Sequence, residues 1–361
     1  MEPRRITMSA LYNGVNVTTQ LAPYLNSFTY TDVASGESDS INIVLNDRDR
    51  KWIGPWFPYI GDEIQPTIQF HNWREGKNFE EFPCGMFHVD DFSFRGGPIH
   101  LNLEGTAIPT ASGFKTTKRT ETYEAFTLQE IGQIIASRSG VALYYEADPI
   151  YVEKVEQSNT TDCEFFNKLV KKYGLALKIY NDRLVVFAED VYEFAPAKLD
   201  LTEADIDPNW SWNNKSIGIY DGVRYEYSHS DKNCTFYVFI GDGPRMLYCN
   251  EAVGNLYEAV IVALAALNEA NREMTTMTIK IKAHPGLIAT DCVNLELGNL
   301  SGKYYIEKIR HNVGDGYDME LDMRRLEVRY VLAERYDRLF GDGTETPESE
   351  SENEDTETPE E

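Results

Sequence analysis

Two distant segments of the sequence repeat the same order of strand-forming elements. In the first, Gly61-Asp-x-Ile64 leads to Gly85-x-Phe87-x-Val89, a Gly-Gly turn and Leu101-x-Leu103. In the second, Thr290-Asp-x-Val293 leads to Gly302-x-Tyr304-x-Ile306, a Gly-Asp-Gly turn and Met319-x-Leu321. Apolar residues at alternate positions are typical of half-buried strands. The repeated order therefore predicts two copies of one β-barrel module within a single chain.

The closing hairpin has the most regular pattern. Between Gly316 and Val328, the apolar residues Tyr317, Met319, Leu321 and Met323 alternate with charged ones. Such alternation predicts a strand with one buried and one solvated face. The preceding strand carries His311 among charged neighbours, and we interpret this histidine as an exposed strand residue with no chemical role.

A compact α+β module is predicted between the two β regions. Thr127 with Glu130, and Thr161 with Glu164, form two capping boxes that begin amphipathic helices. Gly140 and Gly174 are positioned to end those helices. A strand hairpin over residues 175–187, turning at Asn181-Asp182, completes the module.

A long helix is predicted in the last β region, from about residue 251 to residue 272. Its expected core face consists of Val253, Leu256, Tyr257, Val260, Ile261, Leu264 and Leu267. We therefore predict an α+β, β-rich chain with two β-barrel domains flanking a small α+β domain. The expected boundaries are a first barrel over 1–106, the α+β domain over 107–195, a second barrel with the long helix over 196–335, and a disordered acidic tail over 336–361.

The charge of the chain disfavours nucleic-acid binding. The formal net charge is −25, and ten acidic residues lie in the last 21 positions. The first 340 residues still hold 49 acids against 34 bases, a net charge of −15. An acidic surface repels phosphate backbones.

Cysteine usage and hydropathy indicate a protein folded in the cytoplasm. The five cysteines are widely spaced and form no CxxC pair, which favours reduced thiols. The opening residues lack the apolar core of a signal peptide. The longest apolar run, residues 259–267, is too short to span a membrane, so we expect no stable membrane insertion.

No sequence pattern predicts a catalytic, cofactor-binding or metal-binding residue. Nucleophile-elbow, zinc-protease, P-loop and dinucleotide-binding motifs do not occur. Cys84 and His88 would be separated by about 13 Å on a strand, too far to share a metal ion. Asp90 and Asp91 would point to opposite faces of their strand, so they cannot flank one glycosidic bond. We expect no enzyme and no cofactor.

Two other functions fit parts of the sequence. The loop over residues 52–62 is rich in aromatics and proline, and is either tucked beneath the barrel or reserved for a partner. A carbohydrate-binding adhesin would use the tryptophans Trp52, Trp56, Trp73, Trp210 and Trp212. A glycan hydrolase would need carboxylates brought together by folding from distant positions.

Several segments together resemble the phage late control D family of contractile-tail baseplate hub proteins. Residues 157–187 combine Gln-Ser, a polar cap, an aromatic pair, a basic helix end, Tyr-Gly-Leu and a short hairpin. The opening through Asp62, with Asp39-x-Ile41-x-Ile43 and the Trp52 to Trp56 loop, is similar to the Gram-positive, defective-prophage-like branch. The hairpin from Gly302 to Arg325 resembles the closing strand pair of the family.

This resemblance implies a structural role in a virion or phage-tail-like particle. A hub of this family is a homotrimer that adapts a hexameric tail tube to a trimeric spike, because each chain carries two barrels. The implied partners are the tail tube protein, the spike protein and other baseplate proteins, in a phage tail or an R-type bacteriocin. The polar faces Thr278/Lys280/Lys282 and Asp318/Glu320/Asp322 are the candidates for lumen or intersubunit surfaces.

Overall fold

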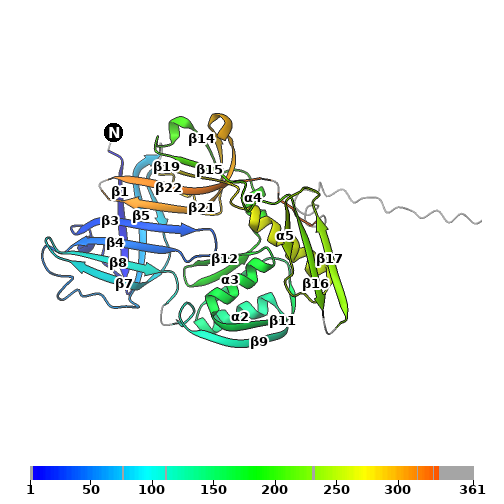
Figure 1. Cartoon of the computed structure of the whole chain (residues 1–361). Helices are drawn as coiled ribbons and strands as arrows, with labels where there is room; N and C mark the ends of the chain where they lie inside the picture. The colour runs from blue at the N-terminus through cyan, green and yellow to red at the C-terminus, as the bar shows by residue number, and fades with distance from the viewer. Residues whose placement is uncertain are drawn as a thin grey trace, which may run out of the picture. The chain divides into compact units, whose positions relative to one another are not determined.

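Strands from both ends of the described chain join in one sheet. The computed structural model describes residues 3–74, 77–109, 112–229, 232–314, 316–327 and 329–332. Residues up to Tyr330 form one unit and those from Val331 onward a second. The predicted acidic tail, 336–361, lies outside the described residues. Within the first unit, one sheet contains fourteen described strands (Figure 1).

Eight of these strands come from the first β region. They are β1 (Arg5–Tyr12), β2 (Val15–Asn16), β3 (Leu25–Val33), β4 (Ser40–Asn46), β5 (Glu63–Arg74), β6 (Lys77–Pro83), β7 (Phe87–Arg95) and β8 (His100–Thr106). The last β region supplies β14 (Leu199–Thr202), β15 (Ser211–Asn214), β19 (Thr275–Ile281), β20 (Cys292–Glu296), β21 (Gly302–Val313) and β22 (Tyr317–Arg325). The short helix α1 (Thr18–Leu21) lies between β2 and β3.

The two β regions place six strands each in the same spatial order. The first β-repeat, defined as β1, β3, β4, β5, β7 and β8, runs β3-β4-β8-β7-β5-β1 across the sheet. The second β-repeat, defined as β14, β15, β19, β20, β21 and β22, runs β15-β19-β22-β21-β20-β14. Numbered along the chain, both repeats have the order 2-3-6-5-4-1. They differ at the last pair, because β1 and β5 are antiparallel whereas β14 and β20 are parallel.

The equivalent hairpins share an irregularity at the same position. The β7–β8 register shifts between Val89 and Asp91, and the β21–β22 register shifts between Ile306 and Lys308. Val89 and Ile306 occupy matching positions in the sequence echo. A bulge inserts one residue into a strand and increases the local twist. Its recurrence supports the correspondence between the two repeats residue by residue.

The two β-repeats are joined by a strand pair that no local sequence pattern predicts. β3 pairs antiparallel with the C-terminal half of β21, from Lys308 opposite Val33 to Val313 opposite Phe28 (Figure 1). Each repeat keeps its own apolar core. Phe28, Ile68 and Leu101 are fully buried in the first, and Ile279 and Leu321 in the second. Full burial of such a side chain stabilises the fold by about 1.5–3 kcal/mol.

The central module forms largely as its sequence predicts. The helices are α2 (Leu128–Ser139) and α3 (Asp162–Lys172), and both capping boxes are present. Gly140 ends α2 with φ of 70°, a left-handed conformation that glycine adopts without a Cβ clash. The predicted hairpin is β12 (Ala176–Tyr180) and β13 (Arg183–Phe187), joined by β10 (Ala142–Glu146). A second sheet, β9 (Lys118–Thr127) with β11 (Tyr151–Thr161), was not predicted.

A segment inserted between β15 and β19 contains the long helix. The helix α5 spans Leu256–Asn271, and the segment also holds β16 (Gly222–His229), β17 (Cys234–Ile240) and β18 (Met246–Cys249). These elements share one apolar core with the central module, whereas we predicted the helix as part of the second barrel. The insertion has no counterpart in the first β-repeat. Its apolar residues pack on the core of the central module.

The expected core face of the long helix is partly wrong. Leu256 and Tyr257 are 52% and 59% exposed, whereas Ala259, Val262 and Ala263 are buried. The helix is apolar around much of its circumference, and small residues allow the closest approach to its neighbours. Only Val253 and Leu267 of the predicted face are buried. Among the described residues, no helix is long and apolar enough to cross a membrane.

A short helix, α4 (Glu189–Phe194), follows β13 and brings acidic side chains to the junction of the repeats. Two single-turn 3-10 helices, η2 (Glu203–Asp205) and η3 (Gly298–Leu300), lie next to strands of the second β-repeat. The division of the body into two barrels and a central domain at residues 106 and 195 stays a prediction.

Candidate functional site

The strongest candidate for a functional surface is the polar face of β19, β22 and β21. Alternation places one side chain in two on each face of a strand. Thr278 and Lys280 of β19 lie opposite Asp322 and Glu320 of β22. The two sets predicted as lumen or intersubunit surfaces therefore share one face. Lys282 lies one residue beyond β19 and is exposed.

Ion pairs and hydrogen bonds run across this face from strand to strand. Thr278 Oγ1 donates to Asp322 at 2.8 Å, and Lys280 Nζ lies 3.4 Å from Glu320. Arg310 of β21 contacts Glu320 at 2.6 Å and Asp322 at 2.9 Å. Partial exposure makes each pair worth little alone, about 0–1 kcal/mol. Arg310 was not among the residues predicted on this surface, although the alternation of side chains along β21 indicates its position there.

The prediction that His311 is exposed is wrong. Its side chain is 2% exposed, and its ring stacks on Tyr30 of β3 at a centroid distance of 5.4 Å. Nδ1 lies 2.7 Å from the Tyr317 hydroxyl. Burial lowers the pKa of His311 to about 4, against a weaker opposing effect of Asp32. The prediction failed because β3, which is remote in sequence, pairs with β21 and its Tyr30 covers the His311 ring.

A buried charge network connects three parts of the fold. Lys178 of β12 lies 2.5 Å from Asp32 and 3.4 Å from Asp39, and it also donates to the Val33 carbonyl. Asp32 accepts a further hydrogen bond from the Ala289 amide at 2.8 Å. The first β-repeat, the central module and the second β-repeat therefore meet at one lysine–aspartate group.

Burial is the largest influence on Asp39, and it raises the pKa of that carboxyl to about 7. Lys178 opposes this rise and Asp32 adds to it. The carboxyl also accepts hydrogen bonds from the Val33 amide and the Tyr30 hydroxyl, each at 3.0 Å. These contacts hold the turn between β3 and β4 against the central module.

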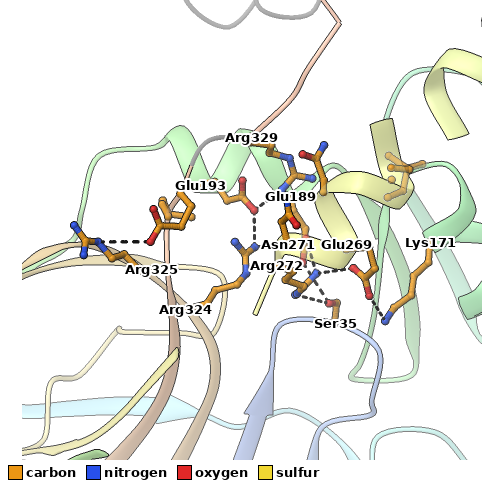
Figure 2. Close-up of a pocket in the computed structure, with 17 residues that line it drawn as sticks. Ser35, Lys171, Glu189, Glu193, Glu269, Asn271, Arg272, Arg324, Arg325 and Arg329 are labelled. Carbon is orange, nitrogen blue, oxygen red and sulfur yellow. Dashed lines mark hydrogen bonds and ion pairs between the residues drawn. The ribbon is translucent and has the colours of Figure 1, made fainter. Parts of the chain in front are cut away.

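A second buried cluster contains arginines and glutamates in equal number. Figure 2 shows most of the cluster, in which side chains from α4, the end of α5, β22 and the segment after β22 converge. Its β21 member, Glu307, is not drawn there. Its members are Arg272, Arg324, Arg329, Glu189, Glu193 and Glu307.

The arginines of this cluster each bridge different elements. Arg324 contacts Glu193 at 2.5 Å and Glu307 at 2.8 Å, and its guanidinium lies 4.5 Å from the centre of the Tyr305 ring. Arg272, at the end of α5, contacts Glu189 at 2.7 Å and Glu307 at 2.8 Å. Arg329 also contacts Glu193.

The cluster has the properties of a structural clamp. Burial raises the pKa of Glu189, but the attraction of Arg272, Arg324 and Arg329 outweighs it and the net shift is downward. The cavity beside these residues measures about 60 Å³, against roughly 300–1,000 Å³ for a small-molecule pocket. The charges therefore neutralise one another where the second β-repeat, α4 and α5 meet.

The residues considered for catalysis or metal binding lie apart. His88 Nε2 is 2.8 Å from Asp182, whereas Cys84 is buried and its pKa is raised by burial. Asp90 and Asp91 are both exposed, and the bulge interrupts the alternation on which their predicted opposite directions rested. Within the described ranges, no three His, Cys, Asp or Glu side chains are arranged to hold a metal ion.

The tryptophans do not form one binding platform. Trp52 is buried and packs edge-on against Trp56 at 5.5 Å, whereas Trp73 Nε1 donates to the Ala283 carbonyl. Trp212 is half-buried on β15, and Trp210 is 38% exposed. The aromatic loop is divided in the same way, because Trp52 is tucked inside while its later residues Phe57, Tyr59 and Ile60 are exposed.

Comparison with solved structures identifies the class of fold. The chain superposes with the 43 kDa tail protein of prophage MuSo2 from Shewanella oneidensis with a TM-score of 0.66, at 14% identity, covering 89% of this chain and 98% of that one. It also superposes with a tail protein from Neisseria meningitidis with a TM-score of 0.67, at 13% identity, covering 89% and 96%. The fold is that of phage tail proteins.

Sequence comparison relates the chain to baseplate hub proteins of phages. The chain is 24% identical over 224 residues to the "Probable baseplate hub protein" of Escherichia phage 186, covering 60% of this chain and 55% of that protein. No family model matches. The resemblance to baseplate hub proteins is therefore confirmed, whereas the Gram-positive branch stays a prediction. The chain spans about half the length of this curated relative.

Proposed function

We propose that this chain is the structural hub of a phage-type baseplate. In this proposal, three copies form a ring that joins the sixfold tail tube to a threefold spike, and no copy carries an enzymatic activity. The partners are the tube protein, the spike protein and other baseplate proteins, in a phage tail or an R-type bacteriocin.

One observation carries the proposal: the strand order 2-3-6-5-4-1 occurs twice in one chain. A sixfold tube offers six equivalent surfaces, and three chains with two similar repeats each can meet all of them. The curated relative and the fold are consistent with this role. The paired charges of the buried clusters favour a scaffold over an active site, and the dispersed tryptophans give the adhesin alternative no support.

The native mass of the purified chain tests the proposal. We expect a concentration-dependent trimer, and electron micrographs of that trimer should show a ring with six similar lobes. Adding tail tube protein should yield a larger complex with one hub trimer per tube end. A monomer at every concentration, or a dimer with twofold symmetry, would contradict the hub role.

A further inference from the structure

One edge of β15 and one edge of part of β7 have no partner strand in the described part of the chain. β15 ends the main path of the sheet, so one of its edges is open. β7 pairs with β8 along its length but with β5 only at Phe87 and His88. The other edge of residues Asp91–Arg95 is therefore open as well. An open edge presents unpaired N–H and C=O groups that can bind another strand.

The chain itself contains a template for covering these edges. In the repeat correspondence, β15 is the equivalent of β3, and β7 is the equivalent of β21. β3 and β21 pair with each other, through residues 28–33 and 308–313. We propose that β15 of one copy pairs antiparallel with β7 of a second copy, just as β3 pairs with β21 inside one copy. The proposal rests on the trimer proposed above and names the surfaces that build it.

The internal template also fixes the register of this contact, called here the β15–β7 seam. Tyr30 lies opposite Ile41, and Trp212 lies opposite Met277 at the equivalent position. Val89 and Ile306 precede equivalent bulges, so Phe94 corresponds to His311. Since His311 lies opposite Tyr30, Phe94 should lie opposite Trp212. The full set of predicted pairs is Asp91–Lys215, Phe92–Asn214, Ser93–Asn213, Phe94–Trp212 and Arg95–Ser211.

The side chains on the two edges are complementary in this register. Asp91 meets Lys215, which places opposite charges in direct cross-strand contact. On the other face, Phe94 meets Trp212, in place of the stacked Tyr30 and His311 of the internal pair. Phe57 already packs on Phe94 at a centroid distance of 5.8 Å, so the tryptophan would extend an existing aromatic group.

The geometry of the seam leads to a ring and not to a twofold dimer. It joins two different surfaces, β15 and β7, and such heterologous contacts repeat from copy to copy until a rotation closes them. With three copies, internal β3–β21 pairs would alternate with intermolecular β15–β7 pairs. The ring would then contain six similar junctions between β-repeats.

Paired cysteines in the full-length chain test the seam directly. Ser93 and Asn213 are both exposed and lie opposite each other in the predicted register. The double variant Ser93→Cys/Asn213→Cys should form disulfide-linked trimers on mild oxidation, visible on a non-reducing gel and reversed by reductant. The matched control Ser93→Cys/Ser211→Cys shifts one cysteine by two residues, or about 7 Å along the strand. It should remain largely uncrosslinked, because a disulfide needs Cα atoms within about 7 Å.

The results separate the seam from the trimer. A trimer by native mass with no crosslink in the Ser93/Asn213 variant would overturn the seam and leave the proposed function standing. A crosslinked ladder longer than three chains would support the seam and contradict the closed trimer. Stronger crosslinking in the control variant would overturn the register, and monomers without crosslinks would overturn the seam.

A charge exchange provides a second test that does not involve cysteine. Asp91→Lys and Lys215→Asp should each weaken the trimer about two- to fivefold, in line with an exposed ion pair. The combined variant should restore the affinity. Lys215 also contacts Glu273 at 2.8 Å within its own chain, so rescue by the double exchange, and not the loss in either single variant, is the decisive readout. Failure of rescue would overturn the predicted pairing.

Discussion

Tyr30 and His311 lie face to face across the strand pair that joins the two β-repeats, with ring centroids 5.4 Å apart and planes inclined by 18°. Nearly three hundred residues of sequence separate them, and both are about 2% exposed. Phe82 packs on the same imidazole at 5.0 Å. An aromatic environment of this kind favours a neutral histidine, because it offers a charged ring little solvation.

His311 should make the fold less stable in mild acid. Its pKa is lowered to about 4 in the folded chain, against an ordinary value of 6.5. The unfolded chain therefore takes up a proton first, and the stabilising contribution present above pH 6.5 is lost as the pH falls towards 4. His311→Phe should remove this loss, which amounts to about 3 kcal/mol at most.

Chemical denaturation of the wild-type chain and the variant between pH 4 and pH 7 measures this effect. Phe82→Leu is the matched control, because it disturbs the same aromatic group but retains the histidine. It should lower the free energy of unfolding without changing its pH dependence relative to wild type. Equal slopes for wild type and His311→Phe would show that His311 does not titrate as described.

Asp39 should have the opposite pH dependence. Burial raises its pKa to about 7, above the ordinary value of 3.8, although Lys178 opposes the shift. Its contribution to stability is therefore complete below pH 3.8 and is lost as the pH rises through 7. Asp39→Asn should cost most in acid and least at pH 8, with a change in cost of at most about 4 kcal/mol.

The same denaturation series tests Asp39→Asn from pH 4 to pH 8. Tyr30→Phe serves as its control, since it removes a hydrogen bond to Asp39 at 3.0 Å but keeps the carboxyl group. We expect the control to lower stability by about 1 kcal/mol. Because the lost hydrogen bond lowers the pKa of Asp39, the control should keep a pH dependence of the same sign as the wild type, whereas Asp39→Asn should remove it. A cost of Asp39→Asn that does not change with pH would contradict this role.

Local patterns in the sequence predicted the elements well and their long-range partners poorly. The capping boxes at Thr127 and Thr161 involve residues three positions apart, and both occur in the structure. The partner of β21, by contrast, is β3 at the other end of the chain. Alternation within a strand does not show which other strand will cover it, so His311 was predicted to be exposed although it is buried.

The candidate site was predictable to the same extent. The polar sets on β19 and β22 follow from alternation, but their convergence does not, because β19 and β22 are neighbours in the sheet without being consecutive in the chain. The Arg324 cluster could not be predicted, because its members come from five separate segments and each looks like an ordinary surface charge. Helix α5 is a similar case, since an insertion in one repeat has no counterpart from which its packing could be inferred.

Removing Arg324 should destabilise the fold strongly. Arg324→Met would leave Glu193 and Glu307 with one fewer cation in a buried site, although Arg329 and Arg272 would still contact them. Breaking a buried ion pair typically costs about 3–5 kcal/mol. The neighbouring Arg325 has a partly exposed side chain 3.9 Å from Glu327, so Arg325→Met should cost under about 1 kcal/mol. Thermal unfolding of both variants distinguishes a clamp from a surface charge, and equal melting temperatures would contradict the clamp.

The polar face of β22 should matter for assembly more than for folding. Reversing Asp318, Glu320 and Asp322 to lysine would place new positive charges beside Lys280 and Arg310, which now contact two of these acids. The face is partly exposed, so loss of these pairs should cost the monomer only about 1–2 kcal/mol in total. If the face lines a lumen or meets a neighbouring subunit, the changed potential should disrupt particle assembly or the passage of cargo. Asp242→Lys, at an exposed position between β17 and β18, is the control for one charge reversal away from this face; it changes the net charge by +2, against +6 for the triple variant. Complementation of a particle lacking this chain gives the readout, and normal particles from a folded triple variant would exclude the face from both roles.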